Sequence, residues 1–195
     1  MVKDFPFPGF ELSGQELSCD YCYAKIPAAD RPVIAKAAWE KGTAAAAAIF
    51  EKFNGEKDFS VIAAKSGLSC EWIDKDYVIA GRRYFSEYFS AKKQILLYSR
   101  SVELWAERHG MDREEAGNLI LSHEYFHFLE CTSLGLTSRM YQVPMLMLGP
   151  LKIGRTGIRA LSEIGAHGFA RFYYELSGSG KTPDESGTSI EEEKQ

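Results

Sequence analysis

The sequence predicts an α+β fold, in which a helical domain carries a small, mostly antiparallel sheet packed on the helix that contains His123 and His127. Three observations lead to this prediction. Apolar residues recur at helical spacing in both halves of the chain. Residues 68–99 are rich in aromatic and β-branched side chains and are interrupted by turn residues, as strands are. The 195 residues are 45% hydrophobic and 26% charged, which is sufficient for one domain with a substantial core.

The chain is expected to divide into three parts. Residues 1–27 are rich in Pro, Phe and Tyr without periodicity, so we expect an irregular N-terminal arm that lies on the domain. Residues 28–176 are expected to form the domain itself. Residues 177–195 contain a single large apolar residue, Ile190, and are expected to be disordered because they cannot bury a core.

Helix signals open the domain. Asp30 can cap a first helix with Pro32 in its first turn, and apolar residues at helical spacing continue to Phe53. Gly42-Thr43 is a candidate for a break or bend in this helix, and Asn54-Gly55 is expected to end it.

A second short helix and then strands are expected next. Asp58 can cap a helix at 59–66, which Gly67 closes. The following segments are expected to be strands that form the small sheet, with turns between them: 68–73, 77–89 and 94–99.

The second half of the chain is expected to be mainly helical. Asp112 with Glu115 three residues later resembles a capping box, which marks the start of a long helix. The expected order is a helix at 102–109 ended by Gly110, the long helix to about Cys131, an irregular link at 133–156 and a last helix at 157–176.

Composition argues against several classes of partner. The formal net charge is −4, so no broad basic surface is implied and nucleic acid is not expected to bind directly. No apolar run approaches the roughly 20 residues of a membrane-spanning helix, and the first residues lack the pattern of a secretion signal, so no membrane role is expected. Four cysteines do not make a disulfide framework, and we expect a reduced, cytoplasmic protein. Nothing in the sequence sets the oligomeric state.

The segment that points to chemistry is His123-Glu124-Tyr-Phe-His127. Two histidines four residues apart on a helix project from one face and can bind one metal ion. Glu124 can then reach a water molecule on that metal and accept its proton, which is the H-E-x-x-H arrangement of zinc peptidases. A random shuffle of this composition gives about one such match in a hundred chains. The plain alternative is a helix with two buried or solvated histidines, but a Glu between them on a core-facing helix would be costly.

A catalytic zinc ion also needs a third protein ligand and an open position for water. Glu163 is the better candidate, because it lies on the next long helix with 35 residues between it and His127, enough for the two helices to lie side by side. Gly165 and Gly168 would let these helices approach closely. The alternative for Glu163 is an exposed surface carboxylate. His109 is a poorer candidate, because a histidine at a helix C-terminus is explained by the helix dipole.

Other side chains near the motif have several candidate roles. His167, one turn after Glu163, is a candidate catalytic residue that can orient a ligand, stabilise an oxyanion or replace a ligand; a solvated histidine is the alternative. Tyr141 is a second candidate oxyanion donor. Glu130, one turn beyond His127, is a candidate partner for that histidine, although an exposed carboxylate is favoured.

The cysteines offer a weaker idea. Cys19-Asp-Tyr-Cys22 is half of a zinc ribbon, and the isolated Cys70 and Cys131 do not complete it. A thiolate of the N-terminal arm could bind the catalytic zinc as an inhibitor, since cysteine is a good zinc ligand. Ordinary, partly buried thiols are the simpler interpretation.

The sequence resembles the ImmA/IrrE-like zinc metallopeptidases, which are of the gluzincin type, over residues of about 44–176. The segment from Asp58 to Leu68 is similar to the family's short helix that leads into its first strand. Gln94-Ile-Leu-Leu-Tyr98 resembles the edge strand that docks substrate. Glu163-Ile-Gly-Ala166-His-Gly-Phe169-Ala170 is similar to the family's E-x-x-A-x-x-F-A, whose Glu is the third zinc ligand.

The resemblance implies a zincin-like minimal metallopeptidase, with Zn²⁺ held by His123, His127 and Glu163. The leading hypothesis is zinc-dependent peptide hydrolysis, in which Glu124 activates the metal-bound water. The implied substrate is an intracellular protein, with a helix-turn-helix transcriptional repressor as the candidate, extended against the strand at 94–99. The same ligand set also accommodates Mn²⁺ or Fe²⁺, although His/His/Glu favours zinc. The alternative is a zinc-containing binding module that sequesters a partner protein without cleaving it.

Overall fold

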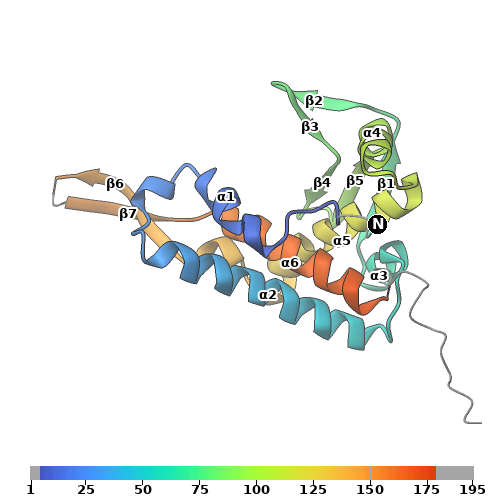
Figure 1. Cartoon of the computed structure of the whole chain (residues 1–195), viewed down its shortest axis with the longest axis horizontal. Coiled ribbons are helices and arrows are strands. Elements are labelled where there is room, and N and C mark those ends of the chain that lie inside the picture. The colour runs from blue at the N-terminus through green and yellow to red at the C-terminus, as the bar shows by residue number, and fades with distance from the viewer. Residues whose placement is uncertain (1–4, 150, 179–195) are drawn as a thin grey trace, which may run out of the picture.

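The computed structural model of the chain describes residues 5–149 and 151–178 and has an α+β fold (Figure 1). Its helices are α1 (Ser13–Ser18), α2 (Asp30–Lys52), α3 (Phe59–Lys65), α4 (Ser99–His109), α5 (Arg113–Leu129) and α6 (Ala160–Leu176). Its strands are β1 (Ser69–Ile73), β2 (Tyr77–Ile79), β3 (Arg82–Tyr84), β4 (Ser86–Phe89), β5 (Gln94–Tyr98), β6 (Gln142–Leu148) and β7 (Leu151–Gly157). The predicted α+β class is confirmed at this coarse level.

Helices α2 and α6 lie side by side along the long axis of the molecule, with α5 beside α6 (Figure 1). Gly42, a predicted break or bend, lies inside the continuous helix α2. It lies where α6 comes closest, because a Cβ atom at position 42 would be 2.0 Å from the carbonyl oxygen of Gly165. The break was therefore a wrong prediction, and the glycine is required for close packing of two helices.

The small sheet has the strand order β1-β5-β4, in which β5 pairs parallel to β1 and antiparallel to β4. The sheet is therefore mixed, and β5 is its central strand. This contradicts the expectation that the strand at 94–99 is the edge that docks substrate. Among the described strands, β1 and β4 are the edges of this sheet, and β4 packs on α5.

Two hairpins lie outside this sheet. The segment expected as one strand at 77–89 divides into β2, β3 and β4. Ala80 and Gly81 both have positive φ and turn the chain back on itself between β2 and β3. The link at 133–156 was expected to be irregular, but it contains the hairpin β6–β7, which projects from one end of the body (Figure 1). Pro144 makes the sequence of β6 look like a loop, because proline is rare within strands. It is tolerated here because each strand of a two-stranded sheet has one unpaired edge.

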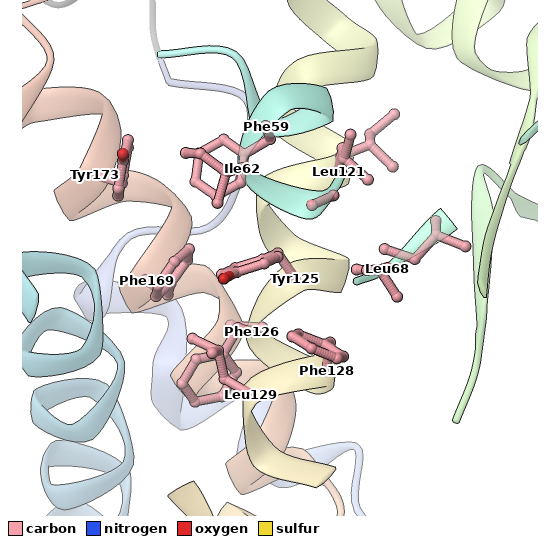
Figure 2. Packing of buried hydrophobic residues seen from close by; sticks show 14 of the residues in the cluster. Phe59, Ile62, Leu68, Leu121, Tyr125, Phe126, Phe128, Leu129, Phe169 and Tyr173 are labelled. Atoms are coloured by element: carbon pink, nitrogen blue, oxygen red, sulfur yellow. The ribbon is translucent and has the colours of Figure 1, made fainter. Parts of the chain in front are cut away.

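The main core lies between α3, α5, α6 and the sheet. Aromatic rings of α5 and α6 meet there with Phe59 and Ile62 of α3, as Figure 2 shows. The ring centroids of Phe59 and Tyr173 are 4.7 Å apart, in an edge-to-face arrangement that aromatic pairs prefer. A second buried cluster joins the N-terminal segment to α2 and the start of α6 through Leu17, Ile26, Ala38, Ile158 and Leu161. The first cluster packs α5 against α6, and the second packs the start of α6 against α2 and the N-terminal segment.

Two of the three predicted helix caps are confirmed. The carboxylate of Asp58 accepts a hydrogen bond from the backbone N–H of Ser60, and that of Asp112 accepts one from Glu115. Asp30 is wrong as a cap, since it is the first residue of α2, and its carboxylate accepts a hydrogen bond from the hydroxyl of Tyr141 instead.

The N-terminal segment is less irregular than expected. Residues 10–25 contain α1 and two short 3₁₀ turns, Phe10–Leu12 and Tyr23–Lys25, and they pack on α2 and α6. The tail predicted at 177–195 lies outside the described residues beyond Gly178. None of the helices in the described residues combines the length and the hydrophobicity that crossing a lipid bilayer requires.

Candidate metal centre

Helices α5 and α6 bring His123, His127 and Glu163 together. One donor atom from each residue lies within 4.8 Å of the donor atoms of the other two. The Nε2 atom of His123 is 3.3 Å from Glu163 Oε2, and that of His127 is 3.7 Å from Glu163 Oε1. The residues predicted as metal ligands from the sequence therefore form one cluster, and it is the one cluster of this kind in the described residues.

Local sequence explains this convergence. The two histidines lie four residues apart in the middle of α5 and so share one face of it. Glu163 lies in the first turn of α6, and Gly165 follows two residues later. A Cβ atom at Gly165 would be 2.8 Å from the Phe126 ring of α5, so the glycine lets the two helices approach, as predicted. Gly168 differs from its prediction, because it faces Trp39 of α2 rather than α5.

The donor set suits a divalent metal with one open side. Two imidazoles and one carboxylate are the protein ligands of a common class of catalytic zinc site. The side chains of His123 and His127 are 12% and 19% exposed, whereas that of Glu163 is 46% exposed. The two imidazoles are therefore largely enclosed, whereas the carboxylate of Glu163 remains partly open to solvent.

Glu130 holds His127 from behind. Its Oε2 atom is 2.9 Å from His127 Nδ1, and its Oε1 atom accepts hydrogen bonds from the Thr137 N–H at 2.7 Å and the Ser162 hydroxyl at 2.9 Å. The residue is only 4% exposed. The exposed carboxylate favoured from the sequence is therefore wrong, because the π-helical turn Glu130–Leu134 brings the following chain over it. A carboxylate on the far nitrogen of a ligand histidine fixes the orientation of the ring and leaves Nε2 for a metal.

The histidines and glutamates of the metal cluster shift one another's pKa. Burial by itself lowers the pKa of His127, but the hydrogen bond to Glu130 and the charges of Glu163 and Glu124 raise it to about 9. Partial desolvation raises the pKa of Glu163, but the hydrogen bond to His123 and the neighbouring histidines lower it to about 2. Glu163 is consequently an ionised carboxylate, which is the form that binds a cation.

Glu124 lies between the metal cluster and the sheet. Its Oε1 atom accepts a hydrogen bond of 2.7 Å from the hydroxyl of Ser86, the first residue of the edge strand β4. This contact orients a carboxylate that follows directly after His123 in the chain. Sequence analysis missed Ser86, because only the pairing of β4 with β5 and the packing of β4 on α5 bring it to the motif.

His167 lies beside the cluster without belonging to it. The centroid of its ring is 5.1 Å from that of His123. Burial, followed by the charge of His123, lowers the pKa of His167 to about 3, so its imidazole is neutral at pH 7. A neutral ring at this place is suited to donate or accept a hydrogen bond, and its catalytic role stays a prediction.

The other candidates lie apart from the centre. The hydroxyl of Tyr141 is bound to Asp30, so Tyr141 is not available as an oxyanion donor in this arrangement. Cys22 is buried in the second core cluster and Cys19 is exposed, and neither belongs to the cluster of metal-binding groups found in the described residues. His109 packs on Trp105 at the end of α4.

One element of the site was not foreseen. The ring of Phe7, in the N-terminal segment, lies 5.4 Å from the ring of His123 and 5.7 Å from that of His167. Glu16 of α1 is close enough for Glu163 to affect it, since burial and then the charge of Glu163 raise the pKa of Glu16. The predicted N-terminal arm therefore reaches the metal cluster. No periodicity or motif in residues 1–27 indicates this contact.

Comparison with known proteins does not assign a function, which must therefore be argued from the chemistry of the site. No family model, no curated protein and no solved structure matches the chain.

The Glu130→Gln variant tests the support of His127. Gln has nearly the same shape but no negative charge, so the His127 ring loses its charge-assisted partner. We expect the affinity for zinc to fall about 10–100-fold, the usual cost of losing such a partner, measured by competition with a chelator. Glu175→Gln, at the exposed end of α6, is the control and should keep wild-type affinity. Unchanged affinity in Glu130→Gln would show that Glu130 only stabilises the fold.

Proposed function

We propose that the protein is a zinc-dependent peptidase, with His123, His127 and Glu163 as the zinc ligands and Glu124 as the general base. The observation that carries the proposal is the convergence of His123 and His127 of α5 with Glu163 of α6, next to the carboxylate of Glu124 on α5. A structural zinc site normally has four protein ligands and no adjacent base. Three ligands with one side open are what a hydrolytic site needs.

In this mechanism the metal ligands, Glu124, Ser86 and His167 have separate roles. Zinc held by these ligands would polarise the scissile carbonyl and lower the pKa of a coordinated water. Glu124 accepts one proton of the attacking water, whose oxygen bonds to the carbonyl carbon, and passes that proton to the amine nitrogen as the C–N bond breaks. Ser86 orients Glu124, and His167 is the candidate that stabilises the negative oxygen.

The edge strand β4 suggests how a substrate would be held. Its free side can pair with an extended peptide through main-chain hydrogen bonds, which is a common mode of peptide recognition. Because Ser86 of β4 is bonded to Glu124, a peptide on this edge would pass the general base. An intracellular protein, such as a helix-turn-helix repressor, is the substrate class that the resemblance to ImmA/IrrE-like enzymes adds to the proposal.

The proposal is tested by incubating the zinc-loaded protein with a mixture of denatured proteins and identifying new N-termini by mass spectrometry. Denatured chains supply extended segments without requiring knowledge of the natural substrate. We expect new termini that disappear when zinc is removed with a chelator and return when zinc is restored. If no zinc-dependent termini form and an uncleaved partner co-purifies with the protein, the site belongs to a binding module.

A further inference from the structure

The N-terminal segment places an aromatic ring on the metal cluster. The Phe7 ring lies 5.4 Å from the ring of Trp105 on α4 and 5.4 Å from the ring of His123 on α5. It stacks on His167 of α6, with an angle of 29° between the ring planes. Helices α4, α5 and α6 thus each contribute one flat ring around Phe7, and we call the place that the Phe7 ring occupies between them the ring pocket.

Few interactions hold this part of the chain in place. Pro6 and Pro8 lack the N–H group of a backbone donor, and within the described residues no hydrogen bond involves the backbone of residues 5–8. Phe5 packs on the ring of Phe7 and on Tyr174, under the guanidinium of Arg171. Side-chain packing alone keeps Phe7 in the pocket, so another aromatic group can displace it.

The pocket also lies on the path expected for a substrate. Phe85 packs on Trp105, with 5.7 Å between the ring centroids, and Phe85 directly precedes Ser86 at the start of β4. A peptide paired with the free edge of β4 would therefore run past both Glu124 and the ring pocket. One of its side chains would point to the place that Phe7 occupies.

We propose that this pocket is the subsite for an aromatic side chain of the substrate, next to the scissile bond, and that Phe7 occupies it as an internal competitor. The inference rests on the proposed peptidase function and adds the substrate class. Flat rings on several sides favour a Phe, Tyr or Trp side chain over an aliphatic one, since aromatic pairs gain from ring geometry beyond their buried area. Binding of a substrate must displace Phe7, so the apparent affinity equals the intrinsic affinity multiplied by the fraction of molecules with an open pocket.

The test compares two hydroxamates, which chelate zinc but are not substrates. Phenylalanine hydroxamate carries an aromatic side chain and acetohydroxamate carries none. Binding to the zinc-loaded protein is measured by calorimetry for the wild type, Phe7→Ala and the control Phe10→Ala. Phe10 lies in the same segment, but its exposed ring packs on Trp39 instead. The experiment does not depend on turnover.

We expect Phe7→Ala to bind phenylalanine hydroxamate about tenfold more tightly than the wild type, as for removal of a competing closed state. The gain should be much smaller for acetohydroxamate, and Phe10→Ala should equal the wild type. Equal affinity in Phe7→Ala and wild type, or the same gain for both hydroxamates, would overturn the proposal.

A second measurement separates this inference from the proposed function. In the zinc-free protein, diethyl pyrocarbonate modifies accessible imidazoles, and mass spectrometry gives the rate for each histidine. We expect His167 to react several-fold faster in Phe7→Ala, with His109 unchanged. An unchanged rate at His167 would contradict the inference. Loss of zinc binding altogether would remove the peptidase proposal while leaving this test of the pocket intact.

Discussion

The Glu124→Gln variant is expected to retain its zinc and to lose roughly 10²–10⁴-fold in kcat/KM for peptide hydrolysis, which is the contribution of a positioned general base. Gln keeps the shape of Glu and can still accept the hydrogen bond from the Ser86 hydroxyl. Its amide cannot accept a proton from water at neutral pH. The loss therefore reports on proton transfer rather than on folding or metal binding.

Zinc content by elemental analysis and kcat/KM on one peptide should be measured together for this variant. The matched control is Glu114→Gln, an exposed glutamate in the first turn of the same helix, which should match the wild type in both. Full activity in Glu124→Gln would assign the general base to another residue and contradict the mechanism. Loss of zinc together with activity would make Glu124 a ligand.

The Gly42→Ala variant is expected to lower the free energy of unfolding by about 2–3 kcal/mol, in the range for overpacked cores. The added Cβ would be 2.0 Å from the carbonyl oxygen of Gly165 and 2.9 Å from the backbone nitrogen of Phe169. Backbone atoms cannot rotate away, so α2 and α6 must separate. This loss outweighs the roughly 1 kcal/mol by which Ala favours a helix over Gly.

Urea unfolding measures this change. Gly14→Ala is the control, because Gly14 lies in helix α1 and its added Cβ would meet nothing within 4 Å beyond its chain neighbours and the backbone of its own helix. That variant should be as stable as the wild type or slightly more stable. If Gly42→Ala were also as stable as the wild type, the close approach of α2 and α6 would not be a feature of the protein in solution. Because α6 carries Glu163, the same displacement should weaken zinc binding.

The parts of the site that follow from local sequence could be predicted. The caps Asp58 and Asp112 need only a side chain and the next backbone N–H groups. His123 and His127 share a face by helical periodicity alone. Glu163 required one further assumption, that the next long helix returns beside the first, and the cluster bears this out.

The parts of the structure that depend on tertiary contacts could not be predicted from the sequence. Glu130 becomes buried only because the chain after α5 returns over it, and an isolated helix would leave it exposed. The strand at 94–99 was expected at the edge of the sheet, but β5 is its central strand. Which strands pair with each other is not encoded in the composition of short strands. The hairpin β6–β7 is hidden by its proline and glycines. Phe7 reaches the site through contacts with three helices that no local pattern predicts.

The central claim is that His123, His127 and Glu163 bind one zinc ion. Elemental analysis of the purified protein, after addition of zinc and removal of the excess, tests it most directly. The wild type is compared with His123→Ala, Glu163→Ala and His109→Ala, the last of which removes a histidine outside the cluster. We predict about one zinc ion per chain in the wild type and in His109→Ala, and none in the other two variants. Full zinc in Glu163→Ala, or no metal in the wild type, would contradict the claim.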